Sequence, residues 1–559
     1  MKKNKYHTLL NKWGTAELVW TVILAVTALC VTCFPLRLPG LYGYEPDILY
    51  HLNRIEGVKA ALAEHRYPAA IYTNFFDGQG YGSPLFYPDL LLVIPAVLRL
   101  MGMSVTVAYK ATVALFSVLL ALVTKYSLKL FCKRWELAVS GAALFSMSQF
   151  VLADIIVRAG FSSYLSYIFL PLLVSGLWDL FAGDGRHIHL LGISLGGLVL
   201  THTLNAFQGI LTAASVSVIM FLSKDGRRTV ADKDRMIKLG LTALASVLIT
   251  AWYWMPMLEQ MTSGVDFVYR HPWADVGEFT QLWEDFFALT GYFFNIAHVG
   301  IGVPILMFIA VRLFSGKPAD ADGRFGDLCY FWGIAMIIAM TDIVPWKVLS
   351  HTIMNQLQFT FRIYPFALIF LTFGIVSSFD RLLAGRDRKE YRARTSVILM
   401  IAVTALSAVF GIVQNRTVST ADPEAFHEMN ETVLRERDNE VGRGEWLPYA
   451  YDREAEIIGE KEENGITMPE RIYYKGYKAR IAGADGKKVW LDVTEGEDGL
   501  VSIADTHGLT GEAELIYRRT PCQILSLIIS ILTLLALIYL QACVRLKGRG
   551  RRIRRPVSR

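Results

Sequence analysis

Residues 17–35 read ELVWTVILAVTALCVTCFP, and soon afterwards residues 43–55 read GYEPDILYHLNRI. The first stretch is apolar and long enough to cross a hydrocarbon core of roughly 30 Å as a helix. It follows a basic start and lacks a small-residue cleavage site, so it predicts an uncleaved membrane anchor. The second stretch places ionisable groups directly outside the bilayer, where such groups are costly and usually mark a functional site.

The composition indicates a polytopic membrane protein. Of its 559 residues, 53% are hydrophobic and 19% are charged, which is too apolar for a soluble chain of this length. The net charge of +6 is concentrated in short loops and at both ends, including the final run KGRGRRIRRPVSR. A basic tail beside a membrane helix indicates the cytoplasmic side, so we predict no nucleic-acid partner. Apart from one CxxC within 17–35, the six cysteines are scattered and do not suit a zinc site.

Further apolar runs follow along the chain. They lie at 136–156, 162–182, 188–203, 205–222, 238–256, 298–313, 328–344, 361–379, 396–414 and 522–544, with two more candidates at 83–102 and 104–128. The first of these two candidates contains Pro84, Pro88, Asp89 and Pro95, so we expect it to be re-entrant or to cross incompletely. Together the runs predict about twelve crossings.

Loops rich in Lys and Arg predict the orientation. The basic loops, which should be cytoplasmic, lie at 224–238, 312–324 and 380–394. The opposite, exterior side then receives 36–84, 257–297, 345–360 and 416–520. Both ends of the chain are expected inside.

We therefore predict a mainly α, polytopic transmembrane protein with three parts. Residues 1–415 form a transmembrane domain with an amphipathic exterior loop at 36–84. Residues 416–520 contain the turn sequences GADGKK and EGEDG and the alternating stretch KVWLDV, which predict a small strand-rich exterior domain. Residues 521–559 form the last transmembrane helix and a basic cytoplasmic tail.

A helix starting near Pro46 would place Asp47, His51 and Arg54 on one face, because their spacing is i, i+4 and i+7. Glu45 adds a second carboxylate just before this helix. Such a pair could bind a divalent cation such as Mg²⁺ or Mn²⁺ through oxygen ligands, or one carboxylate could take a proton from an attacking hydroxyl. The structural alternative is an interfacial helix whose dipole is complemented by Asp47.

Other polar residues interrupt apolar runs on the predicted exterior side. Arg158 closes the run VLADIIV, His202 and Asn205 lie in LTHTLNAF, and Gln358 and Arg362 lie in NQLQFTFRIYPF. A single Arg at a helix end commonly only extends to the headgroups, and a lone His is more often a packed polar residue than a ligand. Two arginines beside two carboxylates would nevertheless suit a phosphate-bearing substrate and a reaction that needs a base.

Several segments carry a family resemblance. They are DILYHLNRIEGVKAAL (47–62), YGSPLFYPDLLL (81–92), RAGFSSYLSYIFLPL (158–172), LTHTLNAF (200–207), LQFTFRIYPF (357–366) and GEWLP (444–448). The acidic motif in the first exterior loop resembles the GT-C superfamily of membrane glycosyltransferases. More narrowly, the segments look like the bacterial YfhO-type membrane family, sometimes labelled as related to pyruvoyl-tetrahydropterin synthase. In that family the arginine segment tends to carry an acid where this chain has Ser163.

The resemblance implies a GT-C-like fold in the cell membrane and a polyprenyl-phosphate-linked sugar donor. The acceptor would be an extracytoplasmic glycan, polymer or protein. Asp47 with Glu45 would deprotonate the acceptor hydroxyl or hold a metal that does so, while Arg362 and Arg158 would bind the leaving phosphate. The remaining predicted pocket residues are His51, Arg54, Tyr87, His202, Asn205, Gln358 and Glu445, although a turn-forming role also fits Glu445.

Two other functions stay open from the sequence. A transporter or flippase for lipid-linked sugars would also need cations near a lipid phosphate, but it would place charges near the midplane on repeated broken helices. A non-catalytic cell-envelope assembly protein would use residues 416–520 to bind a partner.

Overall fold

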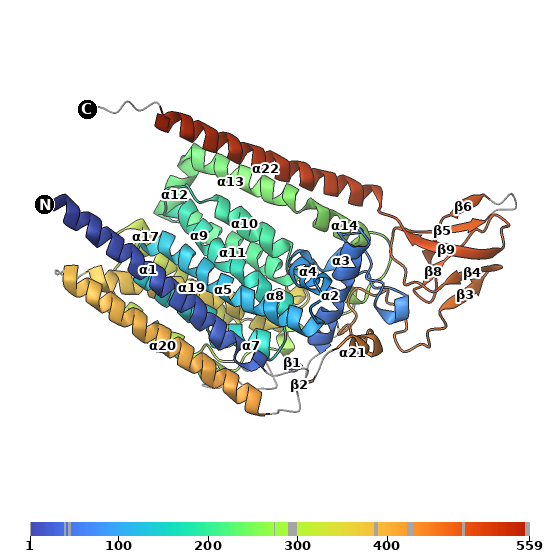
Figure 1. Cartoon of the computed structure of the whole chain (residues 1–559), viewed down its shortest axis with the longest axis horizontal. Coiled ribbons are helices and arrows are strands. Elements are labelled where there is room, and N and C mark those ends of the chain that lie inside the picture. The colour runs from blue at the N-terminus through green and yellow to red at the C-terminus, as the bar shows by residue number, and fades with distance from the viewer. Residues whose placement is uncertain are drawn as a thin grey trace.

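The structure is a computed structural model that describes residues 2–37, 41–42, 46–272, 274–288, 299–384, 389–421, 426–427, 430–482 and 487–553. It is mostly helical, with the helices side by side in one bundle and the strands gathered at one end (Figure 1). Within the described ranges, seven segments are long and apolar enough to cross a membrane, and two bent pairs of helices would raise this number to nine. The predicted mainly α, multi-pass architecture is therefore confirmed.

The seven long segments are Gly14–Cys33, Val105–Cys132, Phe161–Phe181, Thr203–Leu222, Thr360–Ala384, Arg394–Arg416 and Pro521–Cys543. The helices that contain them are α1 (Lys2–Cys33), α5 (Val105–Cys132), α8 (Phe161–Ser166) with α9 (Leu170–Phe181), α11 (Thr203–Leu222), α19 (Tyr364–Ala384), α20 (Lys389–Ala421) and α22 (Pro521–Ile553). The bent pairs are α6 (Trp135–Ser146) with α7 (Gln149–Ile156), at 43°, and α13 (Lys233–Ile249) with α14 (Ala251–Met261), at 63°.

Several predicted spans are shorter or displaced. The runs at 188–203 and 298–313 form only α10 (His189–Val199) and the pair α15 (Val303–Ile309) and α16 (Val311–Phe314). The run at 328–344 corresponds to α17 (Ala321–Ala339). Segment 83–102 is broken, as its prolines predict, into α3 (Ser83–Phe86), a short 3₁₀ turn and α4 (Val93–Leu100). Length and apolarity alone therefore overstated the number of full-length spans.

Helix α19 lies at the centre of the bundle. Its residues from Tyr364 to Val376 are almost completely buried, which fits a segment that is apolar all round. Close packing against α17 depends on small residues, because a Cβ at Gly374 would lie 2.6 Å from the Cα of Tyr330. Small residues allow membrane helices to approach one another in this way.

The strands lie before the last helix. A five-stranded sheet has the order β3-β4-β9-β5-β6, with only the β4–β9 pair parallel, and β7 pairs with β8. The strands are β3 (Glu460–Glu463), β4 (Ile466–Pro469), β5 (Tyr477–Ala482), β6 (Lys488–Leu491), β7 (Thr494–Glu495), β8 (Val501–Ser502) and β9 (Gly511–Tyr517). Upstream, β1 (Leu41–Tyr42) pairs with β2 (Phe426–His427). The sheet thus begins later than residue 416, because α20 continues to Ala421.

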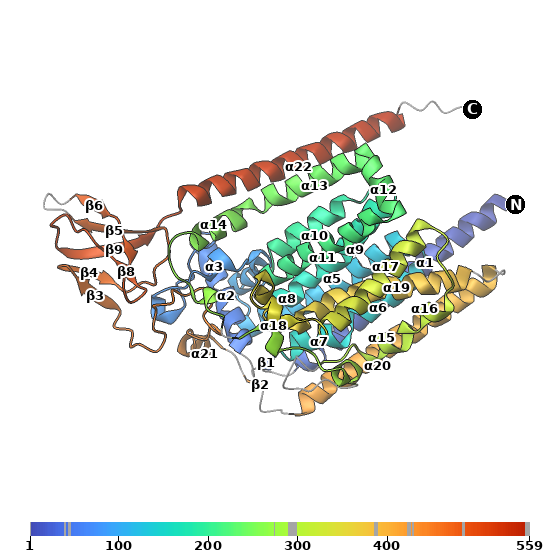
Figure 2. The same cartoon turned by 180° about the vertical axis from the view of Figure 1, so that it is seen from behind.

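The end of the bundle nearest the sheet carries the amphipathic helix α2 (Pro46–Ala63), α3 and the short helix α21 (Glu431–Glu436), whereas both termini lie at the opposite end (Figure 1). From behind, α12 (Lys224–Ala231) and the first turns of α20 also lie toward the termini (Figure 2). Two contacts fasten the sheet region onto the loop after α2: Gln79 donates to Glu470 at 2.9 Å and accepts from the Tyr451 hydroxyl at 2.5 Å.

Candidate functional site

A cavity of about 250 Å³ opens at the end of the bundle nearest the sheet. Residues from seven separate parts of the sequence line it: α2, the end of α3, the turn after α7 with α8, the start of α11, α14 with the turn that follows it, the turn before α19 and the segment before β3. Of the residues predicted from the sequence, its lining contains Asp47, His51, Tyr87, Arg158, His202, Gln358, Arg362 and Glu445. The tertiary structure therefore brings together most of a site that is widely dispersed along the chain.

Of the other three predicted residues, the structure places two, Arg54 and Asn205, behind the lining. Glu45 lies outside the described residues. Arg54 is fully buried beside the cavity and donates to Ser162 at 3.1 Å and to the Pro88 carbonyl at 2.8 Å. Asn205 is also buried, and it donates to the hydroxyl of Ser166 at 2.7 Å. Neither Arg54 nor Asn205 appears in the lining, so both act in the layer behind it.

Asp47 and Arg158 form the charged centre of the site. Arg158 Nε lies 3.6 Å from Asp47 Oδ2, and Arg158 Nη1 donates to Asp154 Oδ1 at 3.0 Å. The Asp47 side chain is 38% exposed, whereas that of Asp154 is completely buried. Burial alone would lower the pKa of Arg158, but the charges of Asp154 and Asp47 hold it above its ordinary value. Arg158 therefore stays cationic while Asp47 remains open to the cavity.

Asp154 is the residue that the sequence analysis missed. Its second oxygen accepts from the Tyr167 hydroxyl at 2.7 Å, and Ser163 donates to the same hydroxyl at 3.1 Å. A signal was available, because Asp154 is an acid inside the run VLADIIV and precedes Arg158 by four residues, the spacing of an ion pair on a helix. Ser163 belongs to this network and also lines the cavity.

Two turns hold the arginines through backbone conformations that are rare for residues other than glycine. Ala159 has φ of +56°, directly after Arg158. Gln358 has φ of +63° and ψ of −49°, and the Phe359 N–H donates across it to the Leu357 carbonyl at 2.7 Å, which closes a γ-turn of the strained type. Strain of this kind persists only where the surrounding structure enforces it, and it clusters at functional sites.

Arg362 lies at the start of α19 and is nearly buried. Its Nη2 donates to Gln358 Oε1 at 2.8 Å, and its Cζ lies 5.3 Å from the centroid of the Phe359 ring. In the described part of the chain, its Nε has no hydrogen-bond partner and no carboxylate lies within ion-pair distance of the guanidinium. Arg362 thus presents to the cavity a positive charge that the described residues leave unneutralised.

Aromatic rings form one wall of the cavity. Tyr87 stacks on Trp446 with centroids 5.3 Å apart and on Tyr50 with centroids 6.3 Å apart. Arg54 supports this wall from behind, because its Cζ lies 4.1 Å from the centroid of the Tyr87 ring. Trp446 belongs to GEWLP, so the segment before the sheet contributes to a cavity that is otherwise lined mainly by the helical bundle.

The ionisable groups around this wall differ in charge state. Burial and the positive charges of Arg54 and Arg158 lower the pKa of His51 well below its ordinary value, so His51 is neutral. Burial raises the pKa of Glu445, and the nearby charge of Asp47 raises it further. The Glu445 carbonyl accepts from the Tyr269 N–H at 2.8 Å, so its backbone also has the structural role considered from the sequence.

The predicted metal pair is only half placed, because Glu45 lies outside the described residues. Among them, no group of three or more His, Cys, Asp or Glu side chains could hold a metal ion. Asp47 is the one member of the predicted pair that the structure places, and the charged group next to it is the cation Arg158.

No family model and no curated protein matches this sequence. Among solved structures, the chain is similar to arabinofuranosyltransferase AftD from Mycobacteria, with 14% identity, a TM-score of 0.42 and coverage of 71% of this chain and 28% of that one. It is also similar to the apo form of the Archaeoglobus fulgidus oligosaccharyltransferase, with 14% identity, a TM-score of 0.39 and coverage of 71% of this chain and 56% of that one. The complex of that protein with Zn and sulfate gives 14% identity, a TM-score of 0.40 and coverage of 80% of this chain and 60% of that one. The chain therefore spans less than two thirds of the length of each of these proteins.

Proposed function

We propose that this chain is an integral membrane glycosyltransferase of GT-C, YfhO-like type, which transfers a sugar from a polyprenyl-phosphate-linked donor to an extracytoplasmic glycan, polymer or protein. The observation that carries the proposal is the joint placement of Asp47, Arg158 and Arg362 on one cavity at the end of a membrane bundle. An exposed carboxylate and an unneutralised arginine are the base and the phosphate-binding group that such a transfer needs. The sequence motifs of the first exterior loop support the same assignment.

Asp47 acts as the base. Its carboxylate takes the proton of the acceptor hydroxyl, and the acceptor oxygen forms a bond to the anomeric carbon of the sugar. The bond from that carbon to the phosphate oxygen breaks, and its electron pair leaves with polyprenyl phosphate. Asp154 holds Arg158 from the other side, so Arg158 orients the Asp47 carboxylate without closing over it.

Arg362 binds the phosphate of the donor. Negative charge develops on the leaving phosphate in the transition state, and a guanidinium already fixed in place stabilises that charge without reorganisation. The hydrogen bond to Gln358 and the ring of Phe359 fix the guanidinium. Arg158 is the second cation on the cavity, and it contacts the base Asp47.

The remaining lining residues shape the sugar pocket. His51 is neutral, so it contributes hydrogen bonding and shape but no phosphate charge. The stacked rings of Tyr87 and Trp446 offer a flat, mostly apolar wall. Glu445, whose pKa is raised by burial and by the charge of Asp47, supplies carboxyl oxygens that accept hydrogen bonds from sugar hydroxyls.

The test is donor cleavage by purified protein in lipid nanodiscs. A panel of polyprenyl-phosphate hexoses is incubated with and without envelope material as the acceptor source, and released polyprenyl phosphate is measured. We expect release that depends on the acceptor and is lost in Asp47→Asn. The same protein in sealed liposomes reports translocation: translocation of the donor without release would instead identify a flippase, and neither release nor translocation would indicate an assembly protein.

A further inference from the structure

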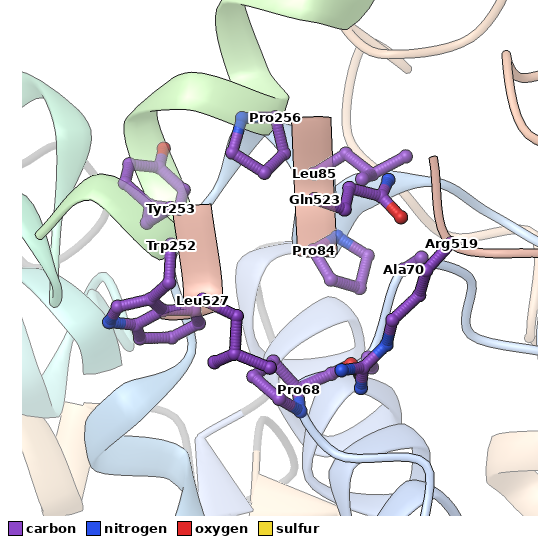
Figure 3. Close-up of a pocket in the computed structure, with 11 residues that line it drawn as sticks. Pro68, Ala70, Pro84, Leu85, Trp252, Tyr253, Pro256, Arg519, Gln523 and Leu527 are labelled. Carbon is purple, nitrogen blue, oxygen red and sulfur yellow. Dashed lines mark hydrogen bonds between the residues drawn. The ribbon is translucent and has the colours of Figure 1, made fainter. Parts of the chain in front are cut away.

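A second hollow lies between α14 and α22, on the side of the bundle away from α1 and α20 (Figure 1). Its walls are mainly apolar, with Trp252 and Tyr253 from α14, Leu85 from α3 and Leu527 from α22. Figure 3 shows the two aromatic residues on one side and Arg519 with Ala70 on the other. We call this hollow the α14–α22 groove. It has an apolar floor and a single cation among its lining residues.

The two helices that flank the groove are tied together at both of its ends. At one end, the Thr520 hydroxyl donates to Glu259 on α14. At the other end, Ser530 Oγ accepts from the Trp252 N–H and donates to the Leu248 carbonyl, both at 3.0 Å. Thr520, directly before α22, and Ser530 on α22 are ten residues apart, or about 15 Å along a helix. They hold the helices at a set distance, so the groove between them stays open.

The start of α22 is also fixed, which positions Arg519. Thr520 and Gln523 form a reciprocal capping box, in which each side chain accepts from the other's backbone N–H at 3.2 Å. Just before it, Arg519 Nη2 donates to the carbonyls of Arg66 at 3.2 Å and Pro68 at 3.1 Å. In the part of the chain that the structure describes, Nε and Nη1 of Arg519 make no hydrogen bond, and they remain able to donate to a ligand.

The position of the groove indicates what covers it. The segment Pro521–Cys543 is a candidate membrane span that is only 17% buried within the protein, and α14 belongs to a bent candidate span. Trp252 and Leu527 belong to these candidate spans, whereas Pro68 and Ala70 come from the loop after α2 and Arg519 lies two residues before Pro521, so the groove joins an apolar part on the spans to a cationic end just outside them. An apolar channel capped by a cation matches the chemistry of an anionic lipid.

We propose that the α14–α22 groove binds one acyl chain of an anionic phospholipid, with the lipid phosphate held by Arg519. This site is distinct from the reaction cavity, and it stands or falls independently of the proposed function. The two are neighbours through Tyr253, which lines the groove and whose hydroxyl donates to the carbonyl of Phe86 at 2.6 Å. Phe86 lines the cavity, so a chain in the groove would pack against a residue that supports the cavity wall.

The experiment is native mass spectrometry of the full chain released from nanodiscs of phosphatidylglycerol and phosphatidylcholine in equal amounts. Arg519→Gln should lower the ratio of retained phosphatidylglycerol to phosphatidylcholine about fivefold, the effect of one cation near a bilayer surface. Leu527→Phe, which fills the groove, should lower the total number of retained lipids. The control for Arg519→Gln is Arg518→Gln, because Arg518 is the adjacent arginine and stacks on Trp490 instead. The control for Leu527→Phe is Leu525→Phe, because Leu525 is exposed on α22 outside the groove.

The proposal is supported if both groove variants lose lipid while both controls behave as wild type. Equal losses in Arg519→Gln and Arg518→Gln would mean that the lipid responds to general surface charge, which would overturn it. Unchanged retention in Leu527→Phe would overturn the assignment of the acyl chain to the groove. Thermal unfolding midpoints close to that of the wild type show that each variant is folded.

Discussion

Arg158 Nε lies 3.6 Å from Asp47 Oδ2, which brings the turn after α7 against the first turn of α2. The same guanidinium is bound on its other side by Asp154, so it is shared between an exposed and a buried carboxylate. This arrangement separates two tasks. Asp154 stabilises the buried cation, and Asp47 stays available for chemistry.

We expect Asp47→Asn to abolish transfer with little loss of folded protein. The amide keeps the shape of the side chain but cannot accept the acceptor's proton, and Arg158 keeps Asp154 as its partner. The measurement is donor-dependent release of polyprenyl phosphate at matched amounts of folded protein. Asp234→Asn, at an exposed residue of α13, is the control and should be fully active. Wild-type turnover in Asp47→Asn would remove this residue from the mechanism.

A chelator separates the base from a metal-dependent role for the same carboxylate. If Asp47 acts as a base, wild-type activity should survive chelation, and Glu45→Gln should be impaired less than Asp47→Asn. If the two carboxylates hold a divalent ion, chelation and both substitutions should each abolish transfer. Activity is measured for all three proteins with and without the chelator and after addition of Mg²⁺ or Mn²⁺.

Arg362→Lys should weaken donor use, and Arg362→Ala should weaken it more. A guanidinium can form two parallel hydrogen bonds to a phosphate, whereas lysine supplies a point charge. A charge-assisted contact contributes roughly 1.5–3 kcal/mol, which corresponds to about one to two decades in rate. Gln358→Ala, which frees the guanidinium from its anchor, should produce a smaller loss of the same kind. Near-normal activity of Arg362→Lys would show that this residue only extends to the headgroups.

Asp154→Asn should destabilise the protein by roughly 3–5 kcal/mol, because it removes the buried partner of a buried arginine. Tyr167→Phe is the matched milder change, since it removes the hydrogen bond to Asp154 and the one from Ser163, at about 1 kcal/mol each, and leaves the buried charge pair in place. Thermal unfolding of Asp154→Asn, Arg158→Gln and the double variant measures the coupling between the pair. If the losses of stability in Asp154→Asn and Arg158→Gln simply add in the double variant, the interaction between Asp154 and Arg158 contributes nothing to stability.

Asp438 should make stability depend on pH. Its burial raises its pKa from 3.8 to about 6, although its carboxylate accepts from the Asp77 N–H at 2.7 Å. Between these two pKa values the unfolded chain has lost the proton that the folded chain still binds, so stability falls as pH rises from about 4 to 6. Unfolding midpoints across this range should fall less in Asp438→Asn than in wild type. Asp452→Asn, an exposed control, should keep the wild-type slope.

The predicted orientation is tested by cysteine labelling of intact cells, in a background without the six native cysteines. Tyr449 is exposed in the segment before the sheet, and Asp234 is exposed on α13 among the basic residues predicted to be inside. We expect an impermeant reagent to label Tyr449→Cys and to spare Asp234→Cys until the cells are opened. The reverse pattern would place the cavity on the cytoplasmic side.

Local features of the sequence were sufficient for the fold class, although they overstated the number of spans. Apolar composition and run length predict a multi-pass helical protein, because a segment of about 20 apolar residues is stable in a bilayer whatever its neighbours are. Prolines predict the break in 83–102, and the alternation of apolar and polar residues predicts strands such as β6. The spacing of Asp47 and His51 also predicts their common face on α2, since that depends only on helix geometry.

Only the tertiary structure decides which polar residues meet. Arg54 shares a helix face with Asp47, yet packing turns it into a buried support for Tyr87, whereas Arg362 and Glu445, far apart in sequence, line the same cavity. Likewise, the sequence shows Asp154 four residues before Arg158 but does not show that α7 ends there and delivers the arginine to Asp47. The physical reason is that these positions depend on long-range packing of separate helices, which no local pattern of residues specifies.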